Sequence, residues 1–148
     1  MSADLVVFDP AEAPRDGEAW REWYERINED DHPEEGEFDR LSPALRSWYD
    51  AMTKDYPDFI RTDNDHPNGM DYSLMGSAIH CVMPRGPGDI GEADKLSNRL
   101  VKELGLGTYD VMSDDGREGR HIVFPDGPLP DVPKPPSFFS KLFGKGKG

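Results

Sequence analysis

Cysteine is almost absent from this sequence, which has a single one, Cys81, in 148 residues. A lone cysteine excludes an intramolecular disulfide framework and a zinc site built on cysteines, and it fits a reducing compartment. Cys81 lies inside an apolar run. We therefore expect a buried, unreactive thiol rather than a nucleophile, which needs a nearby histidine or another cationic group.

Long hydrophobic runs are also missing. No stretch approaches the eighteen or more apolar residues of a membrane span. The first ten residues, MSADLVVFDP, carry no basic region, and their apolar run is too short for a signal peptide. We expect a cytoplasmic protein with no membrane span.

Positive charge is scarce. Asp and Glu outnumber Lys and Arg 30 to 17, which leaves a net charge of −13, and the last eighteen residues carry four lysines against one aspartate. Residues 1–130 therefore carry −16. A field of that sign repels nucleic acid and anionic lipid and speeds encounter with basic proteins, so the charge favours a basic protein partner.

A catalytic or metal-site signature is lacking as well. None of the four histidines forms a pair at the i, i+3 or i+4 spacing of a helical metal site. His32 and His66 stand among acids and leave a weak divalent-ion site open. The loop 63–69 has neither the glycine nor the glutamate spacing of an EF-hand, which favours a turn-rich connector. We expect no metal and no cofactor.

Two further patterns have both a functional and a structural interpretation. Gly86, Gly88 and Gly91 have the spacing of a dinucleotide-binding loop, but they lack its strand context and the acidic residue that should follow. Lys95, Arg99 and Lys102 fall on one face of a predicted helix, where a solvated surface is favoured over an anion site.

Three helices are predicted from apolar spacing. Trp20, Trp23, Tyr24 and Ile27 give one face of a helix from about 17 to 28, with Asp16 as its N-cap. A second helix begins at Pro43 after Ser42 and ends before residue 57. A third extends over about 89–104. Aromatic stripes of this kind are better explained by a core than by a ligand cavity lined with tryptophan.

Strands are predicted from short apolar runs with alternating or β-branched residues. They lie at 4–9, 72–75, 77–83, 109–112 and 121–124. The second and third flank Gly76 and form either two strands or one strand with a bulge at this glycine. Residues 29–39 and 61–70 are predicted to be polar loops.

The resulting order, β-α-α-β-β-α-β-β, matches a ferredoxin-like α+β sandwich, with a mostly antiparallel sheet and helices on one face. We assign residues 1–127 to a single domain and residues 128–148 to a Pro-rich linker and a basic tail. The tail alternates phenylalanine and leucine with lysine. It is solvated, folds back on the acidic body, or contacts a membrane or a partner.

Several segments together carry a resemblance to a known group. They are the Phe8-Asp-Pro10 strand end, the helix with Trp20 to Tyr24, the segment Ser42 to Trp48, Tyr56-Pro57, and Gly107-Thr-Tyr-Asp-Val111 with its later Asp-Asp-Gly. This pattern, over residues 4–126, resembles a loosely defined group of small uncharacterised bacterial proteins similar to toxin-immunity proteins. The resemblance implies neutralisation of a toxin and carries no catalytic residues.

Charge and resemblance together lead to one expected function, with two alternatives. We expect an acidic, non-enzymatic binding protein that neutralises a secreted bacterial toxin domain by direct contact. The expected contacts are Glu29, Asp30, Asp31, Glu34, Glu35, Glu37, Asp39, Asp63 and Asp65. One alternative is a small enzyme or ligand-binding domain with a site on the open sheet face, where an enzyme would use His80 or His121 with an acid such as Asp110. The other is an adaptor recruited through its tail.

Overall fold

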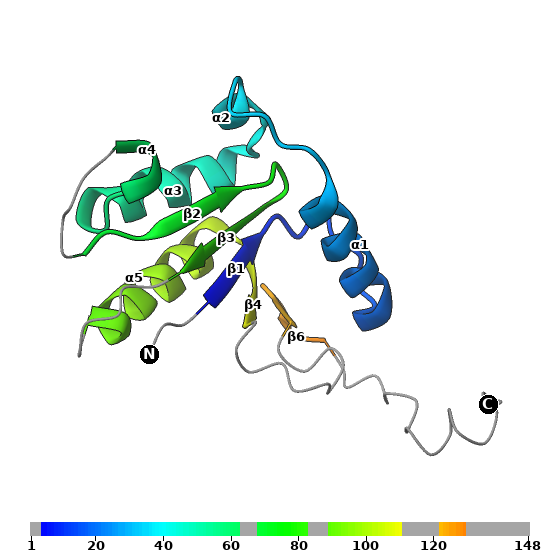
Figure 1. The fold of residues 1–148 in the computed structure, drawn as a ribbon. Helices are drawn as coiled ribbons and strands as arrows, with labels where there is room; N and C mark the ends of the chain where they lie inside the picture. Colours follow the sequence, from blue (N-terminus) through cyan, green and yellow to red (C-terminus); the bar gives the residue numbers. More distant parts are fainter. Residues whose placement is uncertain (1–3, 63–67, 83–88, 111–121, 130–148) are drawn as a thin grey trace, which may run out of the picture.

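A computed structural model describes residues 4–62, 68–82, 89–110 and 122–129 of the chain (Figure 1). In order, the elements are β1 (Asp4–Phe8), α1 (Gly17–Glu29), α2 (Glu37–Arg40), α3 (Pro43–Asp55), α4 (Phe59–Thr62), β2 (Asp71–Leu74), β3 (Ala78–Val82), α5 (Asp89–Leu104), β4 (Gly107–Asp110), β5 (Ile122–Phe124) and β6 (Gly127–Pro128). The protein is thus of the α+β class, as predicted.

The strands form one six-stranded antiparallel sheet in the order β2-β3-β1-β4-β5-β6. The first strand of the chain, β1, lies inside this sheet, where Val6 stands opposite His80 on β3 and Tyr109 on β4. An inner strand of this kind has neighbours along both of its edges. Its apolar sequence therefore supplies side chains to both faces of the sheet.

Helices cover both faces of the sheet, which corrects the expectation of helices on one face. Figure 1 shows α1 on one side and α3 with α5 on the other. Val6 and Phe8 pack in the cluster that contains the α1 side chains, whereas Val7 packs in the cluster of α3 and α5. Because the four successive residues 5–8 of β1 are all apolar, each face has apolar surface that needs a cover.

The core under α1 is built largely from aromatic rings. Phe8 meets the rings of Trp20 and Phe124 edge-on, each at a centroid distance of 5.1 Å, and Trp20 stacks on Tyr24 at 5.4 Å. Phe8 and Trp20 are fully buried. Edge-on and stacked arrangements suit the ring quadrupoles, so these contacts add to the hydrophobic effect of burial.

The second core lies between the other face of the sheet and the pair α3 and α5. Trp48 is fully buried there and donates its indole N–H to Ser97 Oγ on α5 at 3.3 Å. Cys81 is fully buried in the same core, and burial raises the pKa of its thiol. The expected burial of Cys81 is thus confirmed.

The three long helices agree with the spacing predictions, including their first residues. The Asp16 carboxylate accepts a hydrogen bond from the Ala19 amide at 3.0 Å, and Ser42 Oγ accepts one from the Leu45 amide at 3.4 Å. Gly105 follows the last residue of α5. The side-chain oxygens of Asp16 and Ser42 satisfy amides that have no partner within the helix.

Gly76 separates two strands, so the two-strand alternative is correct. Its φ of +76° allows the chain to reverse between β2 and β3, where the Met75 amide donates to the Ala78 carbonyl at 2.9 Å. Glycine adopts this φ without the steric cost that a side chain would add. Ser73 on β2 then lies opposite His80 on β3.

Packed structure continues to residue 129. The strand β6 ends at Pro128, and the buried Leu129 donates its amide to the Ile122 carbonyl at 2.9 Å. The tail from 130 to 148, the loop that contains Gly86 and Gly88, and residues 111–121 with His121 lie outside the described residues.

Candidate partner-binding surface

The acidic segment, residues 29–39, connects the end of α1 to α2. Six of its seven acids are exposed: Glu29, Asp30, Asp31, Glu34, Glu35 and Asp39. Asp63 and Asp65, the other expected contacts, lie outside the described residues. The exposed carboxylates form a strongly negative stretch of surface, and they lie on a segment that has few apolar anchors of its own.

The backbone of the acidic segment is held by side chains at both ends. Arg40 donates from Nη1 to the Glu35 carbonyl at 2.9 Å and from Nη2 to the Pro33 carbonyl. At the other end, the His32 ring contacts the Ile27 carbonyl near the end of α1. These hydrogen bonds, from the Arg40 guanidinium and the His32 ring to backbone carbonyls, restrict the conformations open to the segment.

Glu37 differs from its neighbours and from the expectation of an exposed partner contact. Only 6% of its surface is exposed, and its carboxylate pairs with Arg61 Nε on α4. The predicted loop contains the short helix α2 at this point. A buried, paired carboxylate anchors the acidic segment to the body instead of facing a partner.

Asp58 is the centre of the network that anchors this surface. Its carboxylate is buried, accepts from the Tyr49 hydroxyl at 2.7 Å, and pairs with Arg61 Nη1 at 2.7 Å. Its second oxygen accepts from the amides of Ile60 and Arg61 at the start of α4. Burial, together with the hydrogen bond to Asp58, raises the pKa of the Tyr49 hydroxyl.

Arg61 joins this network to the edge of the sheet. It donates to the Tyr72 carbonyl on β2 at 2.7 Å in addition to its two carboxylate partners. Our sequence interpretation missed Arg61, Asp58 and Tyr49. Asp58 carries a sequence signal, because aspartate is a common residue at a helix N-cap. The contacts of Arg61 with Glu37 and Tyr72 join residues 24 and 11 positions apart and have no spacing signal.

A hollow of about 380 Å³ opens between the acidic segment, α4 and β2. Its lining includes His32, Glu34, Glu37, Arg61 and Ser73, so the structure brings together parts of both predicted contact regions. Ile60 also lines it, and 54% of the Ile60 surface is exposed. An exposed isoleucine beside carboxylates provides apolar contact next to negative charge, a combination that suits the long apolar stems of lysine and arginine.

The proposed pairing of His80 with Asp110 is wrong. His80 stands opposite Val6, whereas Asp110 stands opposite Leu5, and adjacent residues of β1 point to opposite faces. His80 Nε2 lies instead 3.4 Å from Asp4 Oδ2, an ion pair when the imidazole is protonated. Within the described ranges this Nε2 atom is buried without a hydrogen-bond partner.

The described residues contain no cluster of three His, Cys, Asp or Glu side chains that fits a metal ion. Trp20, Trp23 and Trp48 all belong to the two cores, as expected for structural aromatic residues. No helix in the described ranges is long and apolar enough to cross a bilayer.

Neither protein-family models, nor curated proteins, nor solved structures gave a match to this chain.

Proposed function

We propose that this chain is an acidic cytoplasmic binding protein that neutralises a basic toxin domain by direct contact, as an immunity protein does. One observation carries the proposal. Six exposed carboxylates lie on a segment whose backbone is held by Arg40 and whose end is anchored by the Glu37–Arg61 pair. This arrangement provides charge and a defined shape in the same place.

Each part of this arrangement has a role in binding. Exposed negative charge accelerates encounter with a basic surface, and the effect weakens as salt increases. Restraint of the segment before binding lowers the conformational entropy lost when the complex forms. The carboxylates then cover cationic groups of the toxin, which prevents the toxin from engaging its own substrate.

We also propose that the sheet belongs to the ferredoxin-like class. Support comes from the order β2-β3-β1-β4, from helical connections between β1 and β2 and between β3 and β4, and from uniformly antiparallel pairing. The strands β5 and β6 extend this arrangement at one edge. The position of α1 on the opposite face from α3 and α5 is the main departure from that class.

Affinity capture followed by a toxicity assay tests the proposed function. The tagged full-length chain is immobilised at low salt, retained proteins are identified, and a retained basic protein is expressed with and without this chain. We expect a partner that elutes with salt and arrests growth unless this chain is present. The variant Glu34→Gln/Glu35→Gln/Asp39→Asn should lose most of the capture and the protection.

A matched variant removes the same charge from another part of the surface. Glu12, Glu18 and Glu22 are exposed residues outside the acidic segment, and their replacement by glutamine should leave capture and protection nearly intact. Equal loss in both triple variants would mean that only overall charge matters. Absence of any salt-sensitive partner whose toxicity this chain suppresses would overturn the proposal.

A further inference from the structure

The three basic residues on one face of α5 have different surroundings in the structure. Lys95 pairs with Glu92 at 3.9 Å, and Arg99 pairs with Glu103 at 3.8 Å. Within the described ranges Lys102 has neither an ion pair nor a hydrogen bond. It lines a pocket on the sheet face beside α5, and the proposed toxin contact makes no use of this pocket.

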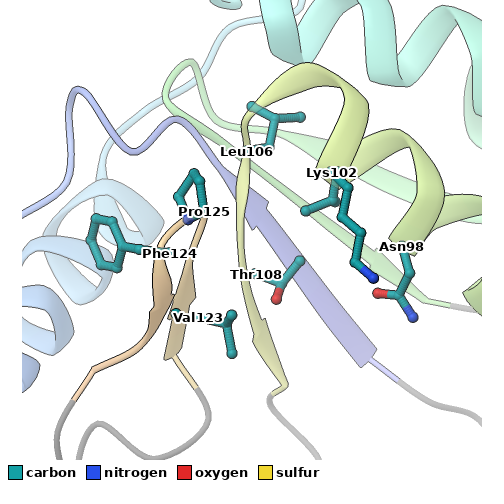
Figure 2. A pocket seen from close by; sticks show the side chains of 9 residues that line it. Asn98, Lys102, Leu106, Thr108, Val123, Phe124 and Pro125 are labelled. Carbon is teal, nitrogen blue, oxygen red and sulfur yellow. The ribbon is translucent and has the colours of Figure 1, made fainter.

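This pocket has a volume of about 280 Å³ and a mainly apolar lining (Figure 2). Val101 and Leu106 contribute from the α5 side, and Val123 and Pro125 contribute from β5 and the turn that follows. Phe124 also borders the pocket, but its ring packs against Phe8 on the other face of the sheet. The pocket exists because the sheet extends past α5 to β5 and β6, so that 38% of the Val123 surface is exposed.

One end of the pocket is polar. Figure 2 shows the side chains of Lys102 and Asn98 extending from α5 on the side of the pocket where Thr108 lies. Asn98 and Lys102 share a helix face because they are four residues apart. An ammonium group, an amide and a hydroxyl together supply donors for a carboxylate. The Asn98 amide donates one N–H to Asp94 Oδ2 at 3.3 Å and keeps a second for a ligand, and the Thr108 hydroxyl has no hydrogen-bond partner among the described residues.

We propose that this pocket binds a small organic carboxylate with an apolar body of about the size of a phenyl ring. The apolar lining takes the ring, and Lys102, Asn98 and Thr108 bind the carboxylate. Small-molecule sites commonly combine an apolar cavity with a few convergent polar groups, and the volume here lies near the lower end of their range.

Within the described residues, none of the neighbouring acids pairs with Lys102. Asp94 accepts a hydrogen bond from the Asn98 amide at 3.3 Å instead. Glu103 is paired with Arg99, and Asp126 is paired with Arg15 at 2.7 Å. Asp110, two residues beyond Thr108 on β4, does not line the pocket. The anion therefore meets a cation that has no ion pair among the described residues, although the protein as a whole is negative.

Two probes of nearly equal shape test the charge requirement. The full-length protein, labelled with nitrogen-15, is titrated with 3-phenylpropionate and separately with the neutral 3-phenylpropanamide, and amide shifts are followed by NMR. We expect saturable shifts at Thr108 and Val123 with the acid. The amide should bind about fivefold more weakly, as expected for loss of a partly solvated ion pair.

Three variants separate this site from general electrostatics. Lys102→Gln should reduce affinity for the acid about fivefold and leave affinity for the amide unchanged. Lys95→Gln removes the same charge from the same helix outside the pocket and should leave both affinities unchanged. Val123→Trp should block both probes by filling the cavity. Equal affinities for acid and amide, equal effects of the two lysine variants, or no saturable shifts would overturn the proposal.

Discussion

Gly107 lies directly against the ring of Phe8 in the core under α1. A Cβ atom at residue 107 would lie closer than 3.0 Å to three atoms of that ring. The ring has little freedom to move because Trp20 and Phe124 pack against it. We expect Gly107→Ala to lower the free energy of unfolding by about 2 kcal/mol, measured by urea denaturation.

Gly91 is the matched control for this substitution. It lies in α5, and a Cβ atom there meets nothing within 4 Å. Gly91→Ala should therefore raise the free energy of unfolding by about 0.5 kcal/mol, because alanine favours the helix. The same sign for both alanine variants would contradict the packing described for Gly107.

Tyr24 makes a contribution to the stability of the fold that depends on pH. Burial, together with the charge of Asp4, raises its pKa from 10.0 to about 12. Between these values the unfolded chain loses the phenol proton while the folded chain retains it, so stability falls as pH rises. We expect Tyr24→Phe to weaken this dependence, as measured by urea unfolding at pH 9, 10 and 11.

Because other tyrosines also titrate at high pH, the test compares how steeply the free energy of unfolding falls with pH in the two proteins, and not its absolute values. Burial also raises the pKa of Tyr72, so the Phe variant should retain part of the alkaline destabilisation. The phenylalanine ring preserves the stack on Trp20, which keeps the two proteins comparable near neutral pH. If the free energy of unfolding fell equally with pH in the two proteins, the pKa of Tyr24 would be the same in the folded and unfolded states, which would contradict the prediction.

At the scale of elements, Asp58 holds α3, α4 and the acidic segment together. Its buried carboxylate binds Tyr49, Arg61 and two amides at the start of α4. Asp58→Ala leaves Arg61 with one carboxylate fewer in a partly buried site and removes the helix cap. We expect a loss of about 3 kcal/mol in the free energy of unfolding, measured by urea denaturation.

Asp55 is the control for this change. It is an exposed aspartate at the end of α3, and its replacement by alanine should alter stability by less than about 0.5 kcal/mol. A loss below about 1 kcal/mol for Asp58→Ala would mean that the network is not a main anchor of these elements.

The sequence predicted the three long helices but not the two short ones. The spacing of Trp20, Trp23 and Ile27 identifies α1 because three turns repeat the same face. The four-residue helices α2 and α4 have too few residues for any repeat. The helix α4 depends on a cap from Asp58, and both helices depend on the Glu37–Arg61 pair, whose members are 24 residues apart. Neither feature produces a repeated apolar spacing, so periodicity does not predict these helices.

At the scale of the whole molecule, negative charge opposes the compact state. With a net charge of −13, mutual repulsion should be strongest at low ionic strength, where screening extends over about 30 Å at 0.01 M salt. We expect the melting temperature to rise by about 3 °C between 10 mM and 300 mM sodium chloride. Calorimetry of the full chain measures this shift.

The acidic segment should account for a large share of that effect. The variant Asp30→Asn/Asp31→Asn/Glu34→Gln/Glu35→Gln removes four exposed charges, and it should be more stable than the parent chain at low salt. Stability lost to a functional surface is a common compromise in natural proteins. A melting temperature independent of salt, or a variant less stable at 10 mM salt, would contradict this account.

Sequence alone was enough to predict the acidic charge, the α+β class, the three long helices, the N-caps of α1 and α3, and the burial of Cys81. These features follow from local chemistry: side-chain charge, repeated apolar spacing, and caps that satisfy nearby amides. Three-dimensional packing was needed to establish the side of the sheet that α1 covers, the burial of Glu37, and the absence of an ion pair at Lys102 within the described residues. Each depends on partners far away in the chain, and helix periodicity marks which face of a helix is buried but not which surface it meets.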